Sequence, residues 1–269
     1  MRASGPWGRL TAAVPSCRLW PMIPAFDADP LLAACMFLAA ALYTSVGHAG
    51  ASAYIALMAL WGMPAAAMRP TALVLNLIAA SFASLRYWRA GLVRWRALWP
   101  FLAGAVPAAF LGGSIELPSE VYRPMVGAVL LFAAARLLWT KTLPASTAWR
   151  DPPVAVAIAC GAAIGLLAGL TGTGGGIFLS PILLFMAWSA PRSASGIVIV
   201  FVLCNSAAGL LGNVASVRAL PDGFAFYAGA VFAGSVLGST LGVRLPWLFL
   251  QKALAAVLVI AGTKLIGLH

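Results

Sequence analysis

The chain has 269 residues, of which 62% are hydrophobic and only 9% are charged, and its mean hydropathy is +0.98. A soluble domain carries roughly a quarter charged residues, so this composition excludes a water-soluble fold and predicts an all-α integral membrane protein. The net charge of +11 would suit nucleic acid in a soluble protein, but here the lysines and arginines flank apolar runs, where they orient helices in a bilayer. We therefore expect the lipid bilayer as a partner and no nucleic acid.

Residues 1–26 form a basic N-terminal tail that contains three arginines and no acid. The tail lacks the long apolar core of a signal peptide before the first apolar run. We interpret it as a cytoplasmic tail. The alternative is that translation starts at Met22, because the chain becomes apolar just after that residue.

Ten apolar runs follow along the chain, and most of them are long enough to cross a membrane. Two of the ten are short, and each of these two follows a glycine-rich break. Interrupted segments of this kind are typical of half-helices or re-entrant segments that line a cavity at membrane depth. The runs are 31–46, 52–62, 71–88, 97–115, 121–140, 153–170, 176–188, 194–212, 224–245 and 248–268.

An internal repeat relates the two halves of the chain. An offset of 125 residues aligns 47–114 with 172–239 without a gap, and it pairs glycines with glycines and Ser81 with Ser206. We interpret the chain as two homologous membrane repeats, 27–140 and 153–269, joined by a polar linker at 141–152 that contains proline.

The distribution of cations predicts the topology. The richest cluster is formed by the arginines at 86–96, and more cations lie in the linker. If each half crosses four times and the short runs do not cross, these cations and both termini lie on the cytoplasmic side. We therefore expect about eight membrane helices plus the short half-helices. The alternative is ten crossings with the halves in opposite orientation, which places the N-terminal arginines outside.

The acidic residues and cysteines exclude several kinds of chemistry. All acids lie at the ends of apolar runs or in loops, so a relay of carboxylates through the bilayer is not supported. The four cysteines are scattered singly, with no ligand spacing for a metal. We expect no catalytic residues, no metal and no cofactor. The acids are Asp27, Asp29, Glu116, Glu120, Asp151 and Asp222.

The glycine-rich segment 169–181 is the strongest candidate for a binding site. It is not a nucleotide-binding loop, because no Lys-Ser/Thr pair follows the glycines. Consecutive glycines tolerate an unwound backbone, and a helix that begins near Ile177 would present free N–H groups to an anion. The alternative is close packing of helices through small residues.

The first half carries a matching break at 47–51, which contains His48. This histidine either lines the substrate path or is satisfied by backbone groups in the break, and the sequence leaves both interpretations open. Polar residues of the later helices, with Asn76 as a further supporting position, complete the candidate site. The predicted substrate-binding residues are Gly47, His48, Gly50, Ser81, Thr171, Gly172, Thr173, Gly174, Gly175, Gly176, Asn205 and Ser206.

Three further arginines accompany the apolar runs. We expect Arg69 and Arg192 to contact lipid headgroups at the ends of helices, although either could attract anions. We expect Arg136 to extend its charged group toward the membrane surface.

The duplicated halves, the run Gly-Thr-Gly-Gly-Gly-Ile-Phe-Leu-Ser-Pro-Ile-Leu-Leu at 172–184 and the glycine-bearing segment 103–113 together resemble the TauE/SafE family. The resemblance covers about 31–268. It implies a multi-pass inner-membrane transporter of sulfur-containing oxyanions, sulfite first, or of small organic anions such as organosulfonates. The first half departs from the pattern, because Gly47-His-Ala-Gly-Ala51 replaces a fuller glycine run and no proline matches Pro181.

Two other functions compete with anion transport. An intramembrane enzyme would need paired mid-span aspartates, an HExxH motif or a serine with a matching histidine, and the first two are absent. A non-transporting membrane scaffold subunit is the second alternative. The sequence leaves open the cargo, the direction, the coupling ion and whether the chain forms a homo-oligomer.

Overall fold

The structure is a computed structural model, and it describes residues 29–138, 149–214, 220–221, 223–241 and 247–267. The predicted tail at 1–26, Met22 and most of the linker at 141–152 lie outside the described residues. The described part is all-helical and contains no strand. Its helices are α1 (Pro30–Ser45), α2 (Ala51–Leu60), α3 (Ala65–Arg89), α4 (Trp95–Ser114), α5 (Ser119–Leu138), α6 (Val154–Thr171), α7 (Gly176–Phe185), α8 (Pro191–Gly212), α9 (Phe224–Leu241) and α10 (Trp247–Ile266).

Four of these helices, α3, α4, α6 and α8, are long and apolar enough to cross a membrane by length and composition. Among the other helices, α1 has 16 residues and α2 and α7 have ten each. The chain is therefore a multi-pass helical membrane protein. The number of its crossings depends on how the short helices run.

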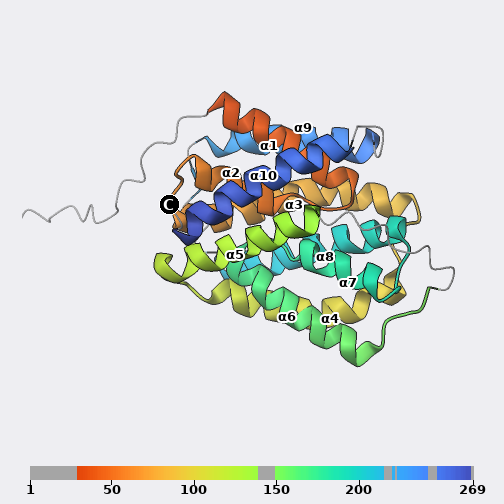
Figure 1. Ribbon diagram of the computed structural model, residues 1–269. Coiled ribbons are helices and arrows are strands. Elements are labelled where there is room, and N and C mark those ends of the chain that lie inside the picture. Colours follow the sequence, from red (N-terminus) through yellow and green to blue (C-terminus); the bar gives the residue numbers. More distant parts are fainter. Residues whose placement is uncertain (1–28, 139–148, 215–219, 222, 242–246, 268–269) are drawn as a thin grey trace, which may run out of the picture.

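The helices form one bundle with two ends (Figure 1). At one end, which we name the Trp61 end, the indole Nε1 of Trp61 donates to Asp29 Oδ2 at 2.6 Å, and Lys264 Nζ donates to the carbonyl of Leu60 at 3.2 Å. The start of α1, the end of α2 and the end of α10 therefore meet there. Hydrogen bonds from the Trp61 indole and from the backbone N–H of Leu31 lower the pKa of Asp29, which caps α1.

At the opposite end, which we name the Arg94 end, Tyr87 at the end of α3 donates to the carbonyls of Thr44 and Ser45, both at 3.2 Å. The backbone N–H of Arg150, just before α6, donates to the carbonyl of Ala187 after α7 at 3.2 Å. Each short helix therefore folds back along the helix that precedes it. Eight crossings would require Ser45 and Tyr87 at opposite ends, but these hydrogen bonds place them at the same end.

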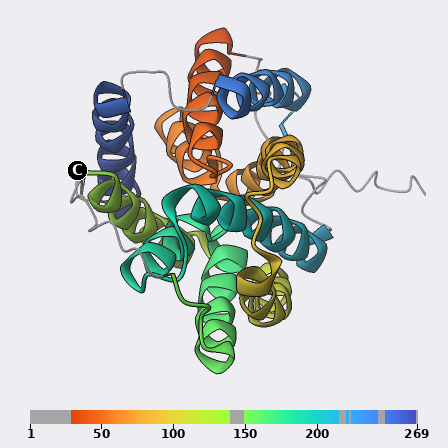
Figure 2. The same ribbon diagram turned by 90° about the vertical axis from the view of Figure 1, so that its right-hand side faces the viewer.

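Close backbone packing joins α4 to α6 along a row of glycines (Figure 2). A Cβ added to Gly161, Gly165 or Gly169 would collide with the backbone carbonyl oxygens of α4. On the other side of the bundle, Gly234 and Gly238 of α9 approach the backbone of α1 in the same way. Because lipid tails are as apolar as the helices, such close van der Waals contact between small residues is what holds membrane helices together.

The turns that end α2 and α7 share one hydrogen-bond pattern but not one residue type. In the first, Gly62 donates to Ala59 and Met63 to Met58; in the second, Ala187 donates to Leu184 and Trp188 to Leu183. The φ angles are +79° at Gly62 and +52° at Ala187, which is the one positive-φ residue other than glycine in the described chain. An alanine in this left-handed region costs roughly 1–2 kcal/mol.

Replacing Ala187 with glycine is therefore expected to raise the free energy of unfolding by about 1 kcal/mol, because the strain disappears while the turn stays the same. Thermal unfolding in detergent would measure the change. The matched variant is Gly62→Ala, where an added Cβ meets nothing within 4 Å, so that backbone strain alone should destabilise the protein by a similar amount. Equal stability of the wild type and Ala187→Gly would contradict this assignment of strain.

Candidate functional site

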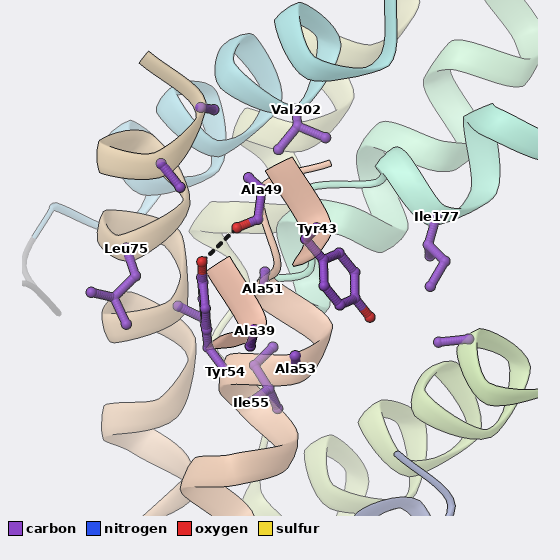
Figure 3. Close-up of a cluster of buried hydrophobic side chains, with 14 of the residues drawn as sticks. Ala39, Tyr43, Ala49, Ala51, Ala53, Tyr54, Ile55, Leu75, Ile177 and Val202 are labelled. Atoms are coloured by element: carbon purple, nitrogen blue, oxygen red, sulfur yellow. Dashed lines mark hydrogen bonds between the residues drawn. The ribbon is translucent and has the colours of Figure 1, made fainter. Parts of the chain in front are cut away.

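The first break separates α1 from α2 at residues 46–50. Gly47 and Gly50 take φ angles of +79° and +101°, which lie in the region that glycine adopts freely. The hydroxyl of Tyr54 donates to the carbonyl of Ala49 at 2.6 Å and holds the unwound segment against α2 (Figure 3). Gly50 is the N-cap of α2 and has no side chain, so among the described residues no side-chain cap accepts from the first N–H groups of α2.

The second break separates α6 from α7 at residues 172–175. Gly172, Gly174 and Gly175 all have φ between +73° and +81°. The hydroxyls of Thr171 and Thr173 lie 2.9 Å apart across the turn. Gly175 is the N-cap of α7, again without a side-chain acceptor, so α7 also begins with uncapped N–H groups.

The two breaks meet in the middle of the bundle. They line one small cavity of about 10 Å³, which is about the room that one water molecule needs. A Cβ added to Gly176 would lie 3.4 Å from Cδ2 of His48, so the two halves touch across this cavity. The lining residues are Tyr43, His48, Ala49, Gly50, Ala51, Ser52, Asn76, Thr173, Gly176, Ile177 and Val202.

Buried amides from α3 and α8 form a polar wall beside the second break. Asn76 Nδ2 donates to Ser206 Oγ at 3.2 Å, and a Cβ added to Gly174 would lie 2.5 Å from that same nitrogen. A Cβ added to Gly175 would lie 3.2 Å from Asn205 Nδ2. Asn76 and Asn205 are 0% and 1% exposed, yet Asn76 Oδ1 and both polar atoms of the Asn205 amide have no hydrogen-bond partner among the described residues.

Such orphaned groups are costly. A buried amide that loses its hydrogen bonds to water and gains none costs roughly 1–3 kcal/mol, so native structures rarely keep one without a reason. Three of the unpartnered atoms belong to Asn76 and Asn205, which lie beside the second break. The positive ends of the α2 and α7 dipoles face a cavity whose lining contains no carboxylate. This arrangement suits a small anion that accepts hydrogen bonds from backbone and amide N–H groups.

The structure brings most of the predicted site residues together. His48, Gly50, Thr173 and Gly176 line the cavity. The two breaks also contain Gly47, Thr171, Gly172, Gly174 and Gly175. Asn205 and Ser206 lie beside the second break but do not line the cavity. Ser81 is the exception: it is exposed on α3 and donates to the carbonyl of Leu77 at 2.6 Å.

Both interpretations of His48 find some support. Its Nδ1 lies 3.4 Å from the carbonyl oxygen of Val46, which is long for a hydrogen bond, and its ring lines the cavity. Tyr43 and Ser52 also line the cavity, and their hydroxyls lie 3.0 Å apart. The prediction from the sequence did not include these two residues. Their positions just before and after the first break were a signal that the sequence offered.

The three arginines differ in their surroundings. Arg192 is exposed at the start of α8, and Arg136 is partly buried, with Nε lacking a partner among the described residues. Arg69 was expected to contact headgroups, but it is only 6% exposed, and its guanidinium donates to backbone carbonyls at the end of α4. A side chain that is enclosed by protein cannot reach lipid headgroups, so that expectation is wrong for Arg69.

In the part of the chain that the structure describes, no group of three or more His, Cys, Asp or Glu side chains could hold a metal ion. The polar side chains that line the cavity carry hydroxyl, amide and imidazole groups. Neutral donors of this kind bind an anion without a buried lysine.

Comparison with known proteins agrees with this picture. The sequence model of the family described as Sulfite exporter TauE/SafE matches residues 32–265. The "Probable membrane transporter protein y4hK" of Sinorhizobium fredii is 40% identical over 239 residues, which cover 87% of this chain and 97% of that protein. No solved structure matches the chain significantly. The protein is therefore a member of the TauE/SafE family of membrane transport proteins.

Proposed function

We propose that the protein carries small anions, sulfite or related sulfur oxyanions and organosulfonates, across a bacterial inner membrane. One observation carries the proposal: two helix starts without side-chain caps face one cavity in the middle of the bundle, which Asn76 also lines, and the unpartnered Asn205 amide lies beside the second break. The family description names sulfite, and the relative from Sinorhizobium fredii is named as a transporter.

The depth of the site supports transport rather than surface binding. Helices α2 and α7 have 10 residues each, so each is about 15 Å long, half the thickness of a hydrocarbon core of about 30 Å. The helix α2 ends at the Trp61 end and α7 ends at the Arg94 end. Both therefore begin near the midplane, which is where carriers with broken helices bind their cargo.

We further propose that the two halves are inverted repeats with ten segments in all. The helices of the second half follow those of the first at an offset close to 125 residues. Helix pairs that pack together in one half of this correspondence have equivalent pairs in the other. The pair α4–α6 corresponds to the pair α9–α1, whereas α3–α8 and α5–α10 each join equivalent helices. Since α1 runs toward the Arg94 end and α6 runs away from it, the halves have opposite orientations.

The exposed arginines at the Arg94 end support a cytoplasmic location for that end. The exposed arginines at helix ends there are Arg86, Arg89, Arg96 and Arg192, and Arg94 is partly exposed. Cytoplasmic loops carry an excess of lysine and arginine. The Trp61 end then faces the outside.

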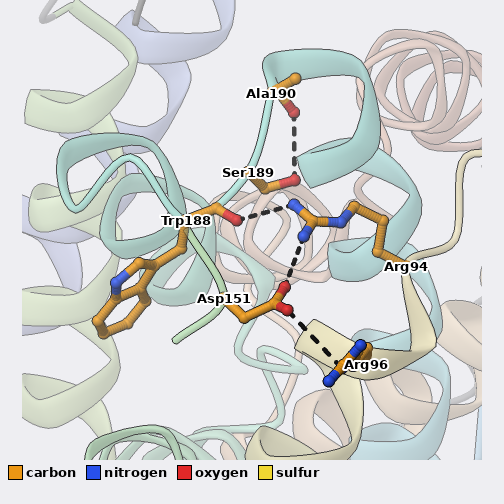
Figure 4. Close-up of polar contacts among 6 residues, drawn as sticks. All are labelled: Arg94, Arg96, Asp151, Trp188, Ser189 and Ala190. Carbon is orange, nitrogen blue, oxygen red and sulfur yellow. Dashed lines mark hydrogen bonds and ion pairs between the residues drawn. The ribbon is translucent and has the colours of Figure 1, made fainter. Parts of the chain in front are cut away.

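Polar contacts between helix ends, at both ends of the bundle, support a closed state of the carrier. At the Arg94 end, Arg94 donates to Asp151 Oδ1 at 2.6 Å and to the carbonyl of Trp188 at 3.1 Å, with Arg96 Nε 3.8 Å from Asp151 Oδ2 (Figure 4). At the other end, Asp29 binds Trp61 and its N–H donates to Tyr227. Partly exposed ion pairs contribute only about 0.2–1 kcal/mol, so the ion pair between Arg94 and Asp151 can break and form reversibly.

Reconstitution tests the proposed function. Purified protein in liposomes is expected to pass labelled sulfite, and more slowly sulfate or methanesulfonate, down an imposed gradient, because the cavity offers donors to any small oxyanion. Protein-free liposomes supply the background. Absence of flux for all three anions would overturn the proposal and favour a non-transporting scaffold, whereas chemical conversion of the anion would favour an intramembrane enzyme.

A further inference from the structure

A second, larger cavity lies at the Trp61 end, away from the midplane. Its volume is about 220 Å³, compared with about 10 Å³ for the cavity between the breaks. It is enclosed by the starts of α3 and α5 and the ends of α4 and α8. Its lining residues are Ala65, Ala66, Arg69, Pro70, Glu116, Leu117, Ser119, Tyr122 and Asn213. We name it the Arg69 cavity.

Arg69 supplies a buried positive charge to this cavity. Its guanidinium donates to the carbonyls of Ile115 at 2.8 Å and Gly112 at 2.9 Å, and also to the carbonyl of Gly113. These acceptors are neutral, and the ion pairs found in the described residues do not include Arg69. Its Nε is buried and has no partner among the described residues. The side chain therefore brings a positive charge to the cavity that has no ion-pair partner within 4 Å among the described residues.

The helices around the cavity add to this positive potential. The helix α3 begins at Ala65 after Pro64, which supplies no side-chain cap, and α5 begins at Ser119. Both starts line the cavity, so two helix dipoles direct their positive ends toward it. Glu116 also lines the cavity, but it is exposed at the rim. The interior thus favours an anion, whereas the rim would repel one weakly.

The cavity also adjoins the second break. The hydroxyl of Tyr122 donates to the carbonyl of Thr171 at 3.2 Å. A Cβ added to Gly172 would lie 3.2 Å from Cγ of Arg69. Two residues that line the cavity, Arg69 and Tyr122, therefore contact the second break, which links this cavity to the midplane site.

We propose that the Arg69 cavity is a second anion site, which holds a small oxyanion or sulfonate at the outer mouth of the path. The proposal rests on the proposed function for its place in transport, but not for binding itself. The cavity has room for such an anion with some of its water, whereas the midplane cavity in this closed state does not.

Equilibrium dialysis of labelled methanesulfonate against the full-length protein in detergent tests this inference without requiring flux. Ala66→Phe fills the cavity from an exposed position and leaves Arg69 and its hydrogen bonds in place. Arg69→Gln removes the charge, and Arg192→Gln is the matched control because it removes an exposed arginine elsewhere. We expect binding to weaken at least tenfold in the first two variants and to stay unchanged in the control.

The midplane variant Asn205→Leu separates the two sites. If the Arg69 cavity binds the anion, Asn205→Leu loses flux but keeps methanesulfonate binding in dialysis. Unchanged binding in Ala66→Phe, or no binding by the wild-type protein, would overturn the inference while leaving the liposome test of transport intact. If the wild-type protein binds methanesulfonate in dialysis but passes no anion in liposomes, the proposed function is overturned and the second anion site is retained.

Discussion

Asn205→Leu is expected to stabilise the protein and to lower anion flux at the same time. The Asn205 amide is 1% exposed, and neither of its polar atoms has a partner among the described residues, so leucine, which has the same branched shape, removes a penalty of about 1–3 kcal/mol. If the amide serves the anion, its loss costs a hydrogen bond to a charged group, about 1.5–3 kcal/mol, or about a 10- to 100-fold drop in flux. Thermal unfolding in detergent and liposome flux measure the two effects.

Thr71→Val is the matched control for this prediction. Thr71 is 0% exposed and its hydroxyl has no partner among the described residues. Unlike Asn205, it is not among the nearest neighbours of the glycines in the second break. Its replacement by valine should also stabilise the protein, with flux unchanged. A destabilised Asn205→Leu variant would show that the amide has a structural partner. A stabilised variant with normal flux would show that the amide has no role in binding.

Gly174→Ala is expected to reduce flux by more than about 10-fold while the protein still inserts in the membrane. The methyl group would lie 2.5 Å from Asn76 Nδ2, and alanine at a φ of +73° adds strain of about 1–2 kcal/mol. Both effects displace the break and the amide wall together. Flux in liposomes measures the loss, and protease resistance of the reconstituted protein reports correct insertion.

Gly62→Ala separates strain from site geometry in this experiment. Gly62 has a φ of +79°, close to that of Gly174, but an added Cβ there meets nothing within 4 Å. The variant should therefore lose stability and keep flux. Equal loss of flux in both variants would mean that backbone strain, and not the geometry of the second break, limits transport.

The sequence by itself determined the class of protein and the places where helices break. Hydropathy predicts membrane helices because lipid exposure demands apolar residues along whole segments. The glycines at 47, 50, 172, 174 and 175 predict unwound backbone because only glycine adopts positive φ freely, and all five have positive φ. These properties are local, so they can be read from neighbouring residues alone.

The tertiary structure alone decided the direction of α2 and α7 and the partners of the polar residues. Asn76 meets Ser206 across 130 residues of sequence, and Arg69 meets carbonyls of α4 instead of lipid. Ser81 matches Ser206 in the repeat register yet is exposed, because equivalent positions in the two halves need not face the same neighbours. Which face of a helix is covered depends on the other helices packed against it, and that information is spread over the whole chain.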